Sequence, residues 1–191
     1  MTTIDELWFH TTEANQQAEQ AYHQLCDRHD DFIEFTTRTQ VSKWRFRTLT
    51  ERIRETAAPY GAHTIVYRPS GELLLVRHEG VDMWVLPGGE VATDETFLDA
   101  AKRELAEEAG IEASYEGLGF LSRIEIEADG YETWGVMPVF AARAETIATD
   151  VADPDDEISR ARWFSEFPDD TRDRDHLVAW REEFFDTTGT T

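Results

Sequence analysis

Three carboxylates and one arginine crowd a short stretch of the chain that has the composition of a helix. Glu107 and Glu108 follow Glu104 by three and four residues, so on a helix these side chains would lie side by side. Like charges this close are destabilising unless something neutralises them. Arg103 can hold a carboxylate with its rigid fork, and a divalent cation can neutralise the rest. Oxygen donors alone favour hard ions, Mg²⁺ or Mn²⁺ before Zn²⁺.

A glycine pair precedes these carboxylates, and a helix is needed to position them. Gly88 and Gly89 have no side chains, so their backbone carbonyls or amides can approach a ligand closely. The sequence predicts a helix over 94–109, with Thr93 as its N-cap and Gly110 as its stop. The apolar residues of this helix fall on one arc next to the carboxylates, so we expect the carboxylates at the edge of a buried face.

Residues 86–111 resemble the signature of the Nudix hydrolase family. That signature reads Gly-x5-Glu-x7-Arg-Glu-U-x-Glu-Glu-x-Gly-U, in which U is an aliphatic residue. Every position of it is matched, by Gly89, Glu95, Arg103, Glu104, Leu105, Glu107, Glu108, Gly110 and Ile111. The likeness continues more weakly over 60–186, and residues 1–57 lie outside it.

This resemblance implies a metal-dependent hydrolase with Mg²⁺ or Mn²⁺ as its cofactor. The substrate would be a nucleoside diphosphate linked to a further group, and water would attack a phosphorus of the pyrophosphate. The implied metal ligands are the Gly88 carbonyl and the carboxylates of Glu104, Glu107 and Glu108.

The same resemblance implies supporting roles for other acidic and basic residues. Glu95 and Arg103 would orient the helix and its carboxylates. One carboxylate would position the attacking water or take its proton, and both Glu104 and Glu157 are candidates. Glu157 belongs to the acidic run 153–157, so it could equally be one more solvated acid.

The surrounding sequence predicts an α+β protein, and the resemblance implies the α/β/α sandwich of the family with a mixed sheet. A final helix is expected at 173–185, and the strands do not alternate regularly with helices. Apolar runs bounded by turn residues predict strands over 62–68, 72–78, 83–86, 115–127, 133–142 and 160–164.

Residues 1–57 are expected to form an N-terminal helical extension, followed by a catalytic domain at 58–191. Apolar spacings of three and four predict one amphipathic helix over 4–26, and a second helix or helix pair over 31–57. The apolar stripe of the first helix suits either a homodimer or a hairpin packed on the catalytic domain. Residues 38–54 are rich in arginine, and we favour ion pairs with the acidic body or with a second subunit over a contact to phosphate or nucleic acid.

The amino-acid composition limits the kinds of partner that the protein can bind. The 191 residues include 40 acids and 18 bases, for a net charge of −22, and lysine occurs only at Lys43 and Lys102. This pattern resembles proteins of salt-in halophilic archaea and disfavours DNA, whereas a bound metal would still admit a small nucleotide. Apolar runs of membrane-spanning length are absent from the sequence, and the first residues are acidic where a leader needs bases. We therefore expect a cytoplasmic protein with no membrane partner.

Two functions of other classes stay open. A nucleotide-binding sensor could keep the fold without turnover, although its signature should be eroded and this one is intact. Alternatively, the N-terminal helices could act as a dimerising partner module.

Overall fold

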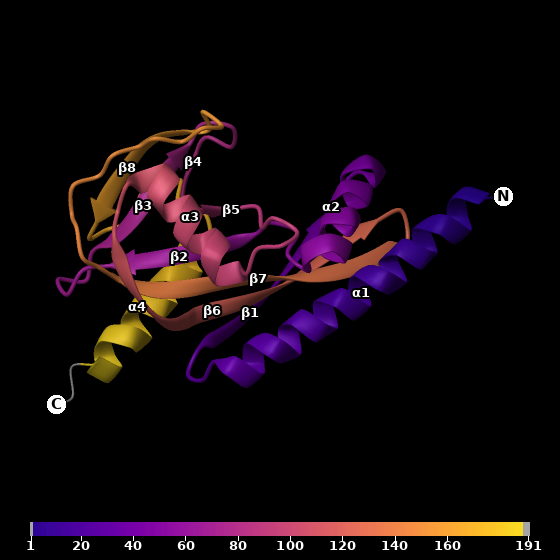
Figure 1. Ribbon diagram of the computed structural model, residues 1–191, viewed down its shortest axis with the longest axis horizontal. Coiled ribbons are helices and arrows are strands. Elements are labelled where there is room, and N and C mark those ends of the chain that lie inside the picture. Colours follow the sequence, from indigo (N-terminus) through magenta and orange to yellow (C-terminus); the bar gives the residue numbers. More distant parts are fainter. Residues whose placement is uncertain (1, 189–191) are drawn as a thin grey trace.

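The computed structural model describes residues 2–188, which form a mixed sheet with helices on both faces (Figure 1). The strand order is β1-β6-β7-β2-β3-β4, with β5 paired to β2 and β8 paired to β3. Residues 1 and 189–191, which the expected domains include, lie outside the described residues. The strands are β1 (Ile33–Gln40), β2 (Ala62–Tyr67), β3 (Leu73–His78), β4 (Met83–Val85), β5 (Gly88–Gly89), β6 (Ala113–Ala128), β7 (Tyr131–Ala144) and β8 (Ile158–Phe164). The helices are α1 (Thr2–Arg28), α2 (Lys43–Thr56), α3 (Phe97–Ala109) and α4 (Arg174–Thr188).

Helices α3 and α4 cover opposite faces of the central strands, because successive side chains of a strand point to opposite faces. Val66 of β2 packs in one cluster with Leu105 of α3. Its neighbour Ile65 packs in another cluster with Leu177 of α4. Strands β1 and β6 run parallel, as do β2 and β7, whereas β6 and β7 are antiparallel. The expected α/β/α sandwich with a mixed sheet is confirmed.

A long hairpin of β6 and β7 carries the N-terminal part of the chain. Its turn places Asp129 at φ 49° and Gly130 at φ 83°, the positive values that a two-residue hairpin turn requires. The buried stripe of α1 packs in the same cluster as α2 and this hairpin. Asn15 Oδ1 accepts hydrogen bonds from Thr133 Oγ1 (3.0 Å) and the Trp134 amide (3.3 Å), which fixes α1 against β7.

The expectation of helix throughout 31–57 is wrong, because residues 33–40 form strand β1. Side chains along β1 alternate between half-buried and exposed, which is the period of a strand. Its residues pair in parallel register with β6, from Ile33 opposite Phe120 to Gln40 opposite Glu127. Helix α2 begins only after Ser42, whose Oγ accepts from the Arg45 amide at 3.2 Å. The N-terminal extension is therefore helix, strand and helix, and its strand joins the sheet.

The apolar stripe of α1 is covered by the chain's own residues. Leu7, Ala14, Ala18 and Leu25 are buried against α2 and β7, as expected for a hairpin packed on the body. Among the described helices, none combines the length and apolar character needed to cross a membrane.

Candidate active site

Helix α3 begins three residues later than the sequence predicted. Its N-cap is Thr96 and not Thr93: the Thr96 hydroxyl accepts from the Asp99 amide (3.1 Å) and donates to the Asp99 carboxylate (2.7 Å). Glu95 is therefore outside the helix, where its carboxylate can turn toward Arg103. The predicted stop is confirmed, because Gly110 caps the helix in the left-handed conformation at φ 63°.

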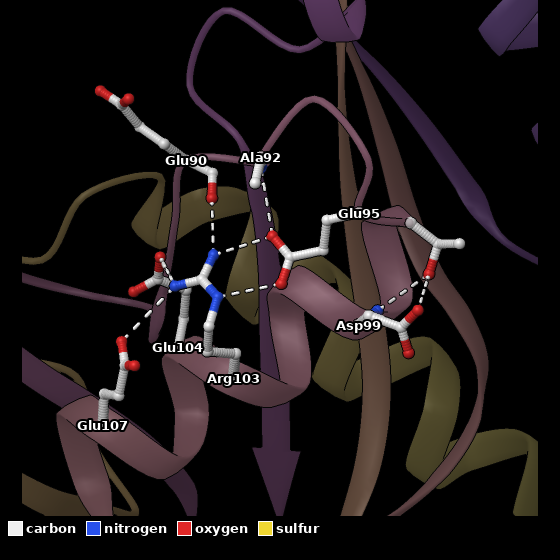
Figure 2. Close-up of polar contacts among 8 residues, drawn as sticks. Glu90, Ala92, Glu95, Asp99, Arg103, Glu104 and Glu107 are labelled. Carbon is white, nitrogen blue, oxygen red and sulfur yellow. Dashed lines mark hydrogen bonds and ion pairs between the residues drawn. The ribbon is translucent and has the colours of Figure 1, made fainter.

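Arg103 connects the carboxylates of the motif (Figure 2). Its Nε and Nη2 donate to the two carboxylate oxygens of Glu95, both at 2.9 Å, in a bidentate pair. Its Nη1 donates to Glu104 at 2.8 Å and to Glu107 at 3.4 Å, and Nη2 also reaches the Glu90 carbonyl. The arginine holds the pKa of the Glu95 carboxyl below its ordinary value. Arg103 thus fixes the loop 90–95 to the carboxylate face of α3.

The other carboxylates of this face lie against the glycine turn. Glu108 is only 7% exposed, and its Oε2 accepts from the Gly88 amide at 2.9 Å. A side chain at Gly89 is excluded, because a Cβ there would lie 2.6 Å from a Glu104 carboxylate oxygen. Burial raises the pKa of Glu108 to about 8, with nearby carboxylates, including Glu104, adding to the rise. Burial also raises the pKa of Glu104, although Arg103 opposes it.

This donor set fits a hard divalent cation. Two carboxylates share a partly buried position beside a bare backbone turn, and their charges repel one another. Over residues 2–188, no group of three or more His, Cys, Asp or Glu side chains is arranged to hold a metal ion. Mg²⁺ is usually bound by one or two carboxylates and completed by water and substrate phosphates. Glu104 and Glu108 match that description, although Arg103 donates to Glu104 (2.8 Å) as well as to Glu107 (3.4 Å).

Glu157 lies at the same site, on the loop that precedes β8. Its side chain is 62% exposed and its Oε2 is 3.4 Å from Nε2 of His78. Asp153 supports the loop, because its Oδ2 accepts from the Glu157 and Ile158 amides at 2.7 and 2.8 Å. The structure thus brings Glu157 and the motif carboxylates to one place. It adds Asp153 and Asp155, which the sequence offered only as members of an acidic run.

A cleft of about 1010 Å³ is bordered by Arg103, Glu104, Glu108 and Glu157, but not by Glu95 or Glu107. Glu104 and Glu108 line it from α3, and Gly88 and Gly89 from the turn. Sequence reasoning missed several further lining residues that come from other elements: Thr37, Thr39, Arg45, Arg52, Tyr60, His63, His78 and Arg172. Only the two arginines of α2 carried a signal, as part of the basic run 38–54. The other lining residues are brought to the cleft by long-range contacts of the fold, which no local sequence pattern predicts.

His63 lies on the cleft wall in the neutral form. Its Nδ1 is buried without a hydrogen-bond partner among the described residues, and β2 places His63 opposite Gly88 in the sheet. Burial, together with the nearby charge of Arg172, lowers the pKa of His63 to about 4. The ring therefore adds no charge beside the carboxylates.

Ion pairs account for half of the six bases in the basic run 38–54. Arg38 binds Glu125 at 2.5 Å, and Arg54 binds both Glu13 and Glu51, at 2.8 and 2.9 Å. Arg52 pairs with Glu90 in the loop that Arg103 fixes. For these three arginines, the interpretation as ion pairs with the acidic body is confirmed.

Comparison with known proteins defines the class of this fold and site. Residues 57–185 match the family model of the NUDIX domain, so the chain belongs to the Nudix family. A relative from Bacillus subtilis (strain 168), described as a candidate 8-oxo-dGTP diphosphatase, is 33% identical over 90 residues. That match spans 47% of this chain and 60% of the relative.

Solved structures of the family resemble the same part of the molecule. A MutT NUDIX hydrolase from Burkholderia pseudomallei matches over 64% of this chain and 94% of its own, with 25% identity and a TM-score of 0.47. A NUDIX family hydrolase from Clostridium perfringens matches over 66% and 95%, with 16% identity and a TM-score of 0.48. The assignment to the family rests on the match of residues 57–185.

Proposed function

We propose that this chain is a pyrophosphohydrolase that uses Mg²⁺ or Mn²⁺ to hydrolyse a nucleoside diphosphate linked to a further group. One observation carries the proposal: the unbroken family motif folds so that Glu104 and Glu108 share one wall of the cleft with the Gly88 turn. Buried carboxylates without a basic partner for each charge attract a cation, and a cation in turn attracts phosphate.

Each residue of the motif has a separate task in this proposal. Glu104, Glu107 and Glu108, with the Gly88 carbonyl, would hold the metal, and Glu107 would first have to leave Arg103. When bound, the ion would neutralise phosphate charge and lower the pKa of the attacking water. Glu95 keeps Arg103 in place by its bidentate pair.

The proton of the water needs a carboxylate acceptor on the cleft. Glu104 is one candidate and is partly buried beside the turn. Glu157 is the other, and its exposed side chain lines the cleft 3.4 Å from Nε2 of His78. Glu157→Gln separates the two candidates: if Glu157 is the base, this variant should lose kcat while its metal affinity stays unchanged, and if Glu104 is the base, kcat should stay close to that of the wild type.

The test is hydrolysis of a nucleotide panel with Mg²⁺ or Mn²⁺ in molar KCl. The panel contains 8-oxo-dGTP, because of the name of the relative, together with dGTP, ADP-ribose and diadenosine tetraphosphate. In heavy-oxygen water, label in a phosphorylated product would identify the phosphorus attacked. Full turnover by both Glu107→Gln and Glu108→Gln would contradict the metal assignment. Absence of turnover by the wild type on every substrate would favour the sensor.

We also propose that the acidic surface adapts the protein to high salt. A net charge of −22 repels itself most strongly in dilute salt, where the Debye length is long. Unfolding on dialysis to low salt, followed by circular dichroism, is the expected result. An unchanged spectrum would contradict this adaptation.

A homodimer, if formed, must use a surface other than the stripe of α1, because that stripe is buried within the chain. Large exposed apolar side chains of the N-terminal segment are Trp8, Phe9 and Trp44. We propose these as the contact, and light scattering in molar KCl tests it. A monomeric mass at high protein concentration would exclude the dimer.

A further inference from the structure

The segment before the family match contributes part of the cleft. Residues 57–185 match the family, yet Thr37 and Thr39 of β1 and Arg45 and Arg52 of α2 line the same cleft as Glu104. In Figure 1, α2 lies on the N-terminal side of the molecule and α3 on the body. The cleft therefore has one wall from the motif and another from the segment 33–56.

The second wall is held firmly in place. Strand β1 is paired with β6 along its whole length, and Phe35 stacks on His176 of α4 with ring centroids 3.8 Å apart. Helix α2 is capped at both ends, by Ser42 and by Ala57 in the left-handed conformation. Phe46 and Leu49 are fully buried beneath it. The side chains that α2 presents to the cleft thus project from a rigid element.

Two arginines on this wall share one face of α2, because seven residues make two turns of a helix. Arg52 is occupied, since it pairs with Glu90 and donates to the Pro59 carbonyl at 3.4 Å. Arg45 is different: within residues 2–188 its guanidinium has neither an ion pair nor a hydrogen bond, although its side chain borders the cleft. Arg45 therefore keeps its charge available at the cleft, in a chain with 40 acids against 18 bases.

We propose that Arg45 binds a phosphate of the substrate beyond the pyrophosphate held at the motif, with Arg52 alongside it. This inference rests on the proposed function and narrows its substrate to nucleotides with a third phosphate. A guanidinium presents a planar fork of donors that matches phosphate oxygens, so it suits this task better than an ammonium group. The hydroxyls of Thr37 and Thr39 supply further donors on the same wall.

The helix itself provides a matched control. Arg47 lies two residues from Arg45, about 200° around the helix, and it is exposed. It does not line the cleft and, in the part of the chain that is described, its side chain likewise has no partner. Arg45→Gln and Arg47→Gln therefore change the net charge equally and differ only in position.

The experiment measures binding without turnover. Calorimetric titrations with Mg²⁺ at one fixed KCl concentration use two probes in which methylene replaces every bridging oxygen between phosphates, the triphosphate α,β:β,γ-bismethylene ATP and the diphosphate α,β-methylene ADP. We expect Arg45→Gln to weaken binding of the triphosphate about tenfold, the range of one charge-assisted hydrogen bond. We expect less than a threefold change with the diphosphate, an intermediate loss for Arg45→Lys, and no loss for Arg47→Gln.

The outcomes separate this subsite from the proposed function. Equal Kd values for Arg45→Gln and Arg47→Gln, in an enzyme that still hydrolyses nucleotides, would overturn the subsite and leave the function standing. If Arg45→Gln weakens binding of the triphosphate but the wild type hydrolyses no nucleotide, the subsite would stand and the proposed function would be overturned. Equal weakening of both probes by Arg45→Gln, or no binding of the triphosphate by the wild type, would also overturn the assignment. Thermal unfolding checks that each variant is folded.

Discussion

The two walls of the cleft are encoded in opposite ways. The motif wall is local: its carboxylates, its arginine and its glycine turn fall within residues 88–108, and one helix and one loop hold them. The wall from residues 33–56 is assembled at long range, by pairing β1 with a strand some ninety positions later, Ile33 opposite Phe120. The first wall presents carboxylates to the cleft, and the second presents two arginines and two threonines, Arg45, Arg52, Thr37 and Thr39.

This difference separates chemistry from selectivity. The motif wall carries the groups that a metal and an attacking water need, and its geometry follows from helix spacing. The wall of β1 and α2 carries donors for a part of the substrate away from the bond that is cut. Variants of the first wall should therefore lower turnover, and variants of the second should alter affinity or stability. Four predictions test that separation, from the largest effect to the smallest.

The largest effect is expected from Glu108→Gln. The change leaves the shape of the buried side chain and removes the charge that would hold the cation, which contributes several kcal/mol in metal-assisted hydrolysis. We expect kcat to fall on the order of 1000-fold. In the wild type, added Mg²⁺ should raise the melting temperature, and this shift should vanish in the variant.

Glu127→Gln is the matched control for that experiment. Glu127 is exposed near the tip of the hairpin and does not line the cleft. Glu127→Gln removes the same charge as Glu108→Gln but at a distance from the cleft. Its activity and the rise in its melting temperature on adding Mg²⁺ should therefore equal those of the wild type. Similar losses in both variants would show that total charge, and not the motif wall, governs metal binding.

The next effect concerns the stability of the second wall. Phe46 is fully buried between α1, α2 and the hairpin, so Phe46→Ala should lower the free energy of unfolding by about 3–5 kcal/mol. Arg47→Ala, on the same helix, should change it by less than about 0.5 kcal/mol, because Arg47 is exposed and its side chain has no partner among the described residues. Denaturant unfolding in fixed KCl measures both.

The same experiment asks whether the walls unfold together. Because β1 is part of the sheet, we expect a single transition for the wild type, reported alike by tryptophan fluorescence and circular dichroism. Two separated transitions, with Phe46→Ala affecting only the first, would show that residues 1–57 form an independent unit as the sequence suggested.

The arrangement of the motif wall could be predicted from the sequence for a physical reason. Helix spacing is short-ranged, so the juxtaposition of Glu104 and Glu108 follows from the chain itself. The start of α3 was misjudged because both Thr93 and Thr96 are good caps, and the pairing of Glu95 with Arg103 selects the second. That choice depends on a contact eight residues apart.

The second wall could not be predicted to the same depth. The alternation of Ile33, Phe35 and Thr37 with polar residues is the period of a strand, but it adjoins helical patterns on both sides. Its partner is set by the whole fold, and no spacing within 31–57 contains that information. The sequence shows that the run 38–54 is basic in an otherwise acidic chain. Only the structure shows that Arg52 and Arg54 are ion-paired and that Arg45 is not.

A smaller effect is expected where α1 meets α2. Arg54 is 25% exposed and binds Glu13 on α1 at 2.8 Å. Arg54→Gln should lower the free energy of unfolding by about 0.5–1 kcal/mol at the lowest KCl concentration that keeps the protein folded, and by less in molar KCl. A double-mutant cycle with Glu13→Gln isolates the pair. A coupling energy that does not decrease with salt would argue against an electrostatic role for this part of the basic run.

The smallest effect concerns pH at the joint between α1 and β1. His29 packs edge-on against Phe140, with ring centroids 5.9 Å apart, and burial together with Arg28 lowers its pKa below 6.5 in the folded protein. Protonation therefore favours the unfolded chain, so the contribution of neutral His29 is complete above pH 6.5 and is lost as the pH falls toward the folded pKa. His29→Gln lacks this titration. We compare the free energy of unfolding of the two proteins from pH 8 to pH 5. The difference between them removes the contribution of the carboxylates that both proteins share. As the pH falls, we expect the wild type to lose stability relative to the variant. If the difference stays constant with pH, the joint of the second wall does not contribute to the acid sensitivity of the fold.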